Sequence, residues 1–291
     1  MKDGQVAIVT GGASGIGRAL AKELARRGVE VVVADVQTEL AETAAAEIRR
    51  QGGRATAARL DVRDAPAFAK LARDTVERAG HIDYLFNNAG IGRGGEVSEY
   101  SLADWDDVVD VNLRGVAYGV QAVYPIMLAR RSGHIINTAS TAGLISTPGL
   151  GGYSATKHAV VGLSKAMRIE AKAHAVKVSV LCPGVIRTPL LTKVGQFPGV
   201  REEDARALLE RFRPMDPQAF ARAALDCVAK NQGVIVVPRW YKALWLLERM
   251  SPTLAETLGT LFHERAKREL EALLIRAKAA PPLAHQNPPR N

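Results

Sequence analysis

Three side chains that can bind or move a proton lie close together between residues 133 and 157. Ser140 follows a short apolar run, and Tyr153 and Lys157 come after a glycine-rich stretch. The tyrosine and the lysine are four residues apart, so a helix would place both on one face. A tyrosine ordinarily titrates near ~10, and a nearby ammonium favours the phenolate and lowers that pKa. The spacing therefore predicts a tyrosine acid/base assisted by a lysine.

A glycine-rich turn near the start of the chain predicts a phosphate-binding site. Gln5–Thr10 is a short apolar run typical of a buried parallel strand. It leads into TGGASGIG, which contains Gly11, Gly15 and Gly17, and then into the helical pattern RALAKELARRG. Glycines allow such a turn to approach a pyrophosphate at the helix N-terminus. The spacing G-x-x-x-G-x-G differs from the standard dinucleotide fingerprint, so the flanking strand and helix carry this interpretation.

The acid at the end of the next strand predicts which dinucleotide binds. Glu30–Asp35 ends in an acid eighteen residues after Gly17. A carboxylate at that point accepts hydrogen bonds from the ribose hydroxyls and disfavours a 2′-phosphate. The glycine turn carries Ser14 and no Arg or Lys. We therefore expect NAD rather than NADP, the alternative being that Asp35 only caps the following helix.

Two further strand ends carry polar groups that suit a cofactor. The strand Ala55–Leu60 ends at Asp61-Val62, where the acid could bond an adenine amino group while Val62 packs on the ring. The strand Ile82–Phe86 leads into Asn87-Asn88-Ala89-Gly90. Small and amide residues allow a turn to pass close to a cofactor, although asparagines before a glycine also occur in ordinary turns.

The remaining elements complete an α/β alternation. Further strands are expected at His134–Thr138, Val176–Leu181 and Gly233–Val237, with helices between them. This alternation predicts a doubly wound parallel sheet with helices on both faces, in which ligand sites collect at the carboxyl ends of the strands. A long helix over Ser101–Met127 should be interrupted near Asn112 and Gly115, because both residue types are unfavourable inside helices. Asn112 could instead be a tolerated surface residue.

With these motifs in order, residues 4–238 resemble the short-chain dehydrogenase/reductase family. The resemblance includes TGGASGIG, Asp61-Val62, NNAG at 87–90, and Pro183-Gly184 with Thr188. It implies a seven-stranded Rossmann-type sheet and a catalytic tetrad of Asn112, Ser140, Tyr153 and Lys157. The tyrosine would act as acid/base, the serine would orient the substrate oxygen, the lysine would hold the nicotinamide ribose, and the asparagine would support a water in a proton relay. No metal is implied.

The resemblance also implies a set of cofactor contacts, with NAD expected and NADP less favoured. The expected cofactor-binding residues are Gly11, Ser14, Gly15, Ile16, Gly17, Asp35, Asp61, Val62, Asn88, Ala89, Gly90, Tyr153, Lys157, Pro183, Gly184, Ile186 and Thr188.

The substrate side is predicted to be apolar. Residues 188–213 contain several leucines and phenylalanines, and in the family this region is a mobile lid. Leu144, Ile145, Pro148 and Leu150 would line the same entrance. These residues favour a hydrophobic secondary alcohol or ketone, lipid- or steroid-like. Alternatively, the leucines pack on the body of the protein or on a neighbour.

Residues 239–280 extend beyond the region of resemblance. Trp240, Leu244 and Leu247 stand at helical spacing, Ser251-Pro252 breaks the pattern, and a second amphipathic pattern follows. Such helices could contact a membrane surface, but packing on the protein or on a second subunit is favoured. Residues 281–291 are expected to be disordered. The resemblance implies a homodimer or homotetramer.

Composition limits the other function classes. The 39 basic and 30 acidic residues among 291 give a net charge of +9, but the basic residues are scattered, so no nucleic-acid partner is expected. Cys182 and Cys227 lack metal-ligand spacing. Without a signal peptide or membrane-spanning run, we expect one catalytic domain over 1–238 in a cytoplasmic protein. The competing hypotheses are an NAD(H) sensor without turnover and a membrane-peripheral interaction protein.

Overall fold

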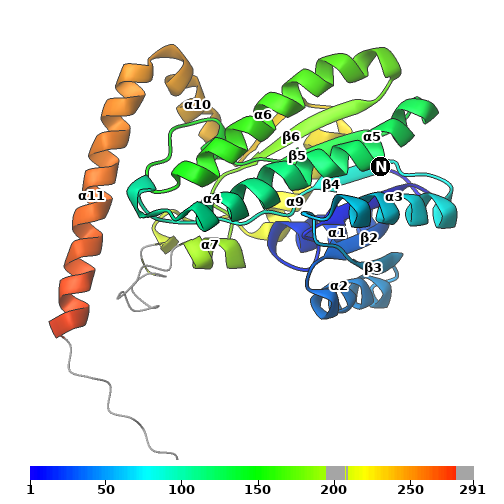
Figure 1. Cartoon of the computed structure of the whole chain (residues 1–291), viewed down its shortest axis with the longest axis horizontal. Helices are drawn as coiled ribbons and strands as arrows, with labels where there is room; N and C mark the ends of the chain where they lie inside the picture. Colours follow the sequence, from blue (N-terminus) through cyan, green and yellow to red (C-terminus); the bar gives the residue numbers. More distant parts are fainter. Residues whose placement is uncertain (195–206, 208, 280–291) are drawn as a thin grey trace, which may run out of the picture.

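The core of the protein is a parallel sheet of seven strands, in the order β3-β2-β1-β4-β5-β6-β7 (Figure 1). The computed structural model describes residues 1–194, 207 and 209–279. The strands are β1 Val6–Thr10, β2 Glu30–Asp35, β3 Ala55–Arg59, β4 Tyr84–Asn87, β5 His134–Thr138, β6 Lys177–Pro183 and β7 Val234–Val237. The sheet confirms the predicted Rossmann-type fold, and every strand begins and ends within two residues of its expected position.

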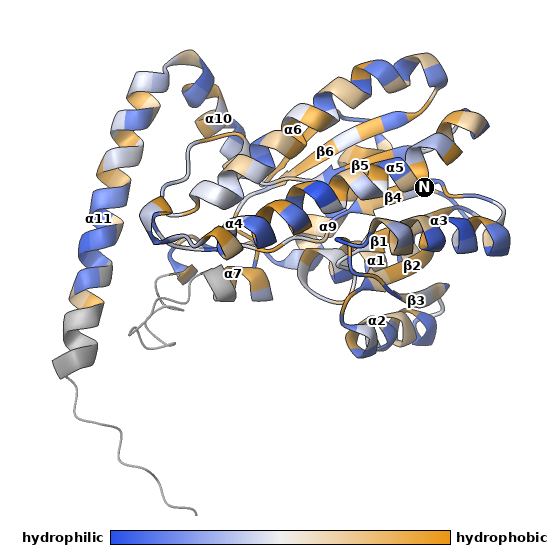
Figure 2. Cartoon of the chain, in the orientation of Figure 1, coloured by the Kyte–Doolittle hydropathy of each residue, from blue (hydrophilic) through white to orange (hydrophobic). Residues whose placement is uncertain are grey.

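Helices cover both faces of the sheet, which is why its strands are almost continuously apolar. One core cluster joins the sheet to α1 (Gly15–Arg26), α2 (Thr38–Arg50) and α9 (Pro217–Ala229). The other joins it to α3 (Ala65–Ala79), α5 (Gly115–Arg130) and α6 (Gly151–Ala171). In Figure 2 these helices carry both hydrophilic and hydrophobic residues along their length.

The strand order reverses direction between β1 and β4. From β1 the chain proceeds outward to β2 and β3, and then returns to place β4 on the other side of β1. The crossover connections diverge at this point, so a crevice forms beyond the carboxyl ends of β1 and β4. The glycine turn and the NNAG turn follow those two strands.

The predicted interruption of the long helix is confirmed. Helix α4 (Leu102–Val109) and α5 are joined by a π-helical segment, Asp110–Arg114, which contains Asn112. Single π turns inside helices are often associated with functional sites. Asn112 is fully buried, so the alternative of a tolerated surface asparagine is wrong.

The C-terminal extension forms two helices that meet at Ser251, as the sequence predicted. They are α10 (Tyr241–Met250) and α11 (Pro252–Ala279), and α11 runs beside the part of the molecule that carries α4 and α7 (Pro189–Val194) (Figure 1). Tyr241 packs in the core, but Leu258 and Leu261 of α11 are about half exposed. The extension therefore covers the core only through α10. Within the described part of the chain, no helix is long and apolar enough to cross a membrane.

Two expectations lie partly or wholly outside the described residues. Half of the stretch 188–213 that was assigned to a substrate lid falls at 195–206 and 208, and the C-terminal segment expected to be disordered falls at 281–291.

Candidate active site

The glycine turn between β1 and α1 is too crowded for any other residue type at Gly17. A Cβ on Gly17 would lie 2.0 Å from the carbonyl oxygen of Gly11 and 2.6 Å from Nδ2 of Asn88. Gly15 has a φ of +52°, which favours glycine. Ser14 precedes α1 without capping it through its side chain, and Ile16 packs against the core. The turn therefore brings backbone N–H groups of the α1 N-terminus to the crevice, an arrangement that suits a phosphate.

Asp35 is buried beside this turn. One carboxylate oxygen accepts a hydrogen bond from the Ala13 N–H at 3.1 Å, and the other accepts one from the Gln37 N–H at 3.0 Å. The carboxylate is thus fixed to the glycine turn that follows β1, and not only to the start of α2. The alternative interpretation, that Asp35 only caps the following helix, is incomplete, because a helix cap would not bond residue 13.

Asp61 has a partner that the sequence analysis missed. Its carboxylate accepts hydrogen bonds from the Arg63 guanidinium, with the shortest at 2.8 Å. These bonds hold the pKa of Asp61 below its usual range. The sequence places Arg63 two residues after Asp61, which allows an ion pair between them. This spacing alone does not predict the pair, because each side chain could also have turned toward another partner.

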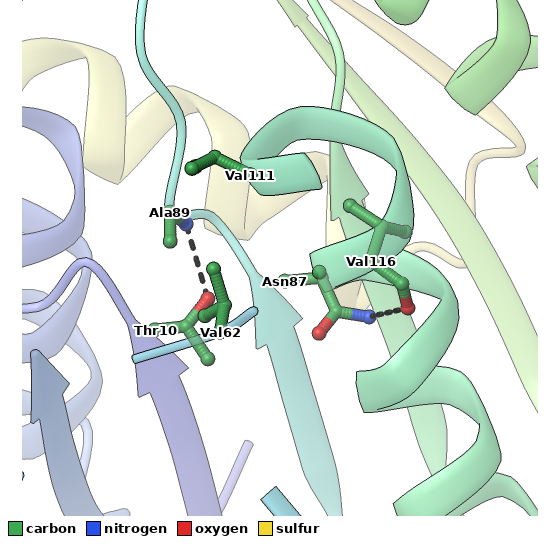
Figure 3. Close-up of a pocket in the computed structure, with 7 residues that line it drawn as sticks. Thr10, Val62, Asn87, Ala89, Val111 and Val116 are labelled. Atoms are coloured by element: carbon green, nitrogen blue, oxygen red, sulfur yellow. Dashed lines mark hydrogen bonds between the residues drawn. The ribbon is translucent and has the colours of Figure 1, made fainter. Parts of the chain in front are cut away.

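Apolar side chains from several segments line a narrow cavity in the crevice, which is too small to hold a water molecule (Figure 3). Val62 follows β3, Ala89 follows β4, and Val111 lies in the π-helical segment. The structure thus brings together Val62 and Ala89, which were both predicted to contact the cofactor, and adds Val111. Asn87 also lines the cavity, and its Oδ1 has no hydrogen-bond partner among the described residues.

Asn88 joins the ends of neighbouring strands. Its Nδ2 donates to the Thr10 carbonyl at 3.0 Å, and its backbone N–H donates to the Thr10 hydroxyl at 3.0 Å. The Ala89 N–H donates to the same hydroxyl at 3.0 Å, as drawn in Figure 3. Thr10 is therefore a supporting residue that sequence reasoning missed. A threonine that ends a strand gives no signal of this role.

Asn112 uses its amide to hold the segment after the NNAG turn. Its Oδ1 accepts from the Ile91 N–H at 2.9 Å, and its Nδ2 donates to the Ile91 carbonyl at 2.9 Å. The same Nδ2 lies 3.3 Å from the Thr156 hydroxyl on α6. The π turn, the NNAG segment and α6 are thereby fixed to one another.

Ser140, Tyr153 and Lys157 meet beyond the ends of β5 and β6. The Ser140 side chain lies near the Tyr153 side chain, and its Oγ accepts a hydrogen bond from the Ala142 N–H at 3.1 Å. Lys157 is buried, and its Nζ donates to the Thr138 carbonyl at 3.0 Å. That Nζ lies 5.5 Å from the centre of the Tyr153 ring.

Burial controls the titration of this group. It raises the pKa of Tyr153 above its ordinary value, and the opposing effect of the neighbouring Ser140 side chain is smaller. Burial also lowers the pKa of Lys157 to about 8. The predicted lowering of the tyrosine pKa by the lysine is therefore not seen. The expectation underestimated the cost of removing the phenolate from water.

The turn after β6 closes the other side of the crevice. Pro183 ends β6, Ile186 is buried, and Thr188 lies next to the glycine turn, since a Cβ on Gly15 would be 3.2 Å from the Thr188 side chain. A Cβ on Gly184 would lie 2.1 Å from the ring of Tyr241 in α10. Contact between Gly184 and the extension was not predictable from the sequence.

Gly90 marks the point where the predicted groups converge. A Cβ there would lie 3.1 Å from the Asn112 Oδ1 and 3.3 Å from the Lys157 Nζ. The NNAG turn, the π segment and α6 therefore meet at one place at the carboxyl edge of the sheet. The glycine turn, the apolar cavity and this cluster form a continuous sequence of contacts that fits an extended dinucleotide.

Comparison with known proteins agrees with this geometry. A family model described as short chain dehydrogenase matches residues 5–198. A 3-oxoacyl-[acyl-carrier-protein] reductase of Synechocystis is 38% identical over 226 residues, covering 74% of this chain and 91% of the relative. A cyclohexanol dehydrogenase of Acinetobacter is 39% identical over 190 residues, covering 65% and 76%. The crystal structure of a short chain dehydrogenase/reductase from Burkholderia phymatum in complex with NAD has a TM-score of 0.79 and 33% identity, covering 87% of this chain and 95% of that one.

A Rossmann-type sheet with a glycine turn and a Ser–Tyr–Lys cluster at its carboxyl edge defines a class of nicotinamide-dependent oxidoreductases. Within that class, the chain belongs to the short-chain dehydrogenase/reductase family. It is an NAD(P)-dependent dehydrogenase/reductase.

Proposed function

We propose that the protein transfers a hydride between NAD(H) and a secondary alcohol or ketone with a hydrophobic body, with Tyr153 as the acid/base. The observation that carries this proposal is the convergence of Ser140, Tyr153 and Lys157 at the carboxyl edge of the sheet, where Lys157 lies next to Gly90. When bound, the nicotinamide supplies the hydride acceptor or donor. The side chains of the protein perform the proton transfer and orient the substrate.

In the oxidation direction, Tyr153 in its phenolate form takes the proton of the substrate hydroxyl, and in reduction its phenol gives that proton to the substrate oxygen. Ser140, which lies near the tyrosine, donates a hydrogen bond to the substrate oxygen and stabilises the negative charge that develops there. Lys157 holds the ribose and keeps a positive charge below about pH 8. Asn112 supports the water of a proton relay while its amide fixes residue 91.

We assign the cofactor to the crevice through the residues that line it. The Gly11–Gly17 turn, with Ser14 and Ile16, accommodates the pyrophosphate. The Asp35 carboxylate accepts hydrogen bonds from the hydroxyls of the adenosine ribose. Asp61 and Val62 surround the adenine, and Asn88, Ala89 and Gly90 line the way from there to Lys157. Pro183, Gly184, Ile186 and Thr188 surround the nicotinamide half. The preference for NAD is supported by the buried Asp35 carboxylate beside the turn. It is further supported by Arg18, the first basic residue after the turn, which pairs with Glu47 rather than pointing freely to the crevice.

The substrate assignment rests on the apolar side chains near Ser140. Leu144 is buried in a core cluster, and Ile145 and Val185 are partly buried and pack against the same cluster. The similarity to a cyclohexanol dehydrogenase supports a hydrophobic cyclic alcohol, and lipid- or steroid-like alcohols are the larger members of the proposed class. We also propose one catalytic domain over 1–238, a lid formed by 188–213, a homo-oligomer and a cytoplasmic location.

The test is NADH formation from NAD with cyclohexanol and with larger secondary alcohols, steroids included. Tyr153→Phe should reduce kcat at least 10³-fold, because it removes the transferable proton. NADH binding, measured by nucleotide fluorescence, should stay within about twofold, because a benzene ring fills the same space. Turnover retained by Tyr153→Phe would exclude Tyr153 as the acid/base. Tight NADH binding without turnover of any alcohol would favour a sensing role.

A further inference from the structure

A second, larger cavity lies between the turn after β6 and the C-terminal extension. Its volume is about 380 Å³, which is in the range of small-molecule sites. It is lined by Val185, Arg211, Phe212, Arg213, Pro238, Trp240 and Tyr241.

This cavity adjoins the proposed nicotinamide site through one residue. Val185 lies between Gly184 and Ile186, and its backbone N–H is 3.4 Å from the Tyr241 hydroxyl. Val185 also packs in the same core cluster as Leu144 and Ile145, the apolar residues assigned to the substrate. A ligand that extends from the reacting carbon over the partly buried Ile145 and Val185 would reach the cavity.

The charge in the cavity comes mainly from Arg213. Arg211 is paired with Glu269 of α11 at 2.6 Å, so much of its charge is balanced. For Arg213, by contrast, no carboxylate lies within ion-pair distance in the part of the chain that the structure describes. The Arg213 backbone has a φ of +48° and is held there by a hydrogen bond from its N–H to the Glu210 carbonyl at 2.9 Å. Residues in this conformation are often found at ligand sites.

The aromatic groups give the cavity an apolar surface beside that charge. Trp240 stacks on Tyr241 with ring centres 3.8 Å apart and is 57% exposed. Phe212 is 42% exposed and meets Phe262 edge to face. An apolar surface next to one available guanidinium fits an amphipathic anion rather than a neutral lipid. A planar carboxylate matches the arginine fork in a bidentate pair.

We infer that this cavity binds the carboxylate end of a hydroxy- or oxo-carboxylic acid substrate, with Arg213 as the anion-binding residue. The alcohol or ketone at the other end of the molecule would then lie at Ser140 and Tyr153. This inference rests on the proposed function and makes it more specific, because a purely neutral alcohol would leave Arg213 without a role.

The kinetic test compares two matched series. One contains carboxylic acids of roughly six to twelve carbons with a hydroxyl on the penultimate carbon, and the other contains the 2-alkanols of the same lengths. We expect kcat/KM to favour the acids by about tenfold or more at one optimum length. Arg213→Gln should bring the ratio of kcat/KM for the acids to kcat/KM for the alkanols close to one. Arg73→Gln, an exposed arginine on α3, should leave it unchanged.

A binding test separates this inference from the proposed function, because it needs no turnover. Decanoate, decanol and decyl phosphate are titrated against the full chain while Trp240 fluorescence is followed, with Trp240→Phe to assign the signal. Decanoate should bind most tightly, and Arg213→Gln should weaken it about tenfold. Equal binding of decanoate and decanol, or tighter binding of the phosphate, would overturn the inference. Turnover of alcohols without binding of decanoate would overturn only the inference about the cavity. The proposed function would then remain supported.

Discussion

Asp35 and Lys157 show how neighbouring groups and burial decide what a charged side chain can do. The Asp35 carboxylate is buried, but two backbone N–H groups bond it, which compensates for the loss of water. Lys157 is equally buried and makes one hydrogen bond, to a carbonyl, and its pKa is lowered to about 8. The lysine therefore loses its charge at moderately alkaline pH, whereas backbone hydrogen bonds hold the Asp35 carboxylate beside the glycine turn.

Removing the charge of Asp35 should therefore change cofactor choice. Asp35→Asn keeps an oxygen that can accept the Ala13 N–H but no longer repels a 2′-phosphate. We expect the ratio of kcat/KM for NADP to that for NAD to rise about tenfold, the equivalent of ~1.4 kcal/mol. Asp35→Ala should raise this ratio too. It should weaken NAD binding more than Asp35→Asn does, because the glycine turn loses the hydrogen bond from the Ala13 N–H to residue 35. The measurement is the initial rate over a range of each cofactor, and an unchanged ratio would refute the role given to Asp35.

The strands and helices could be predicted from the sequence, because their apolar runs and turns are local patterns. The contacts between these elements could not be predicted. β2 and β5 were located to the residue, because buried parallel strands are continuous apolar runs bounded by turns. The π turn at Asn112 was foreseen as a break for the same kind of local reason. However, the pairing of Asn112 with Ile91 and the contact of Tyr241 with Gly184 depend on segments distant in the chain. Periodicity carries no information on such pairs.

The contact between β5 and β6 predicts an acid-sensitive fold. His134 is buried on β5, and its Nε2 lies 2.8 Å from the Ser179 hydroxyl on β6, which itself donates to the Gln232 carbonyl. The imidazole therefore donates its Nε2 proton to Ser179. Burial lowers the pKa of His134 from 6.5 to about 3. Since the unfolded chain then binds the extra proton, stability should fall as pH decreases from about 6.5 towards 3.

This effect can be isolated with His134→Gln, which keeps a donor but does not titrate. Between pH 7 and pH 5 the wild type should lose about 2 kcal/mol more unfolding free energy than the variant. Urea unfolding followed by circular dichroism at the two pH values gives both numbers. The same loss in both proteins would assign the acid sensitivity to other groups.

At the scale of the whole molecule, the C-terminal extension connects loops at the carboxyl edge of the sheet. Glu248 of α10 accepts a hydrogen bond from the Ser146 hydroxyl at 2.8 Å, in the loop between Ser140 and Tyr153. Lys267 of α11 pairs with Glu96 at 2.9 Å, in the segment after the NNAG turn. Together with the pair between Arg211 and Glu269, these contacts place the extension across three loops that surround the proposed substrate entrance.

The contribution of α11 can be tested by exchanging the charges of one pair. Lys267→Glu puts a carboxylate beside Glu96 and near Glu99, so α11 should separate from that loop. Because both groups are about half exposed, we expect a modest effect. The KM for a bulky alcohol should change two- to fivefold, equivalent to ~0.4–1 kcal/mol, and α11 should be cleaved faster by trypsin. Glu96→Lys combined with Lys267→Glu should restore both values. If the single exchange alters neither KM nor proteolysis, the extension does not act through this contact, and its contribution to the site would have to come from α10, where Tyr241 packs against Gly184.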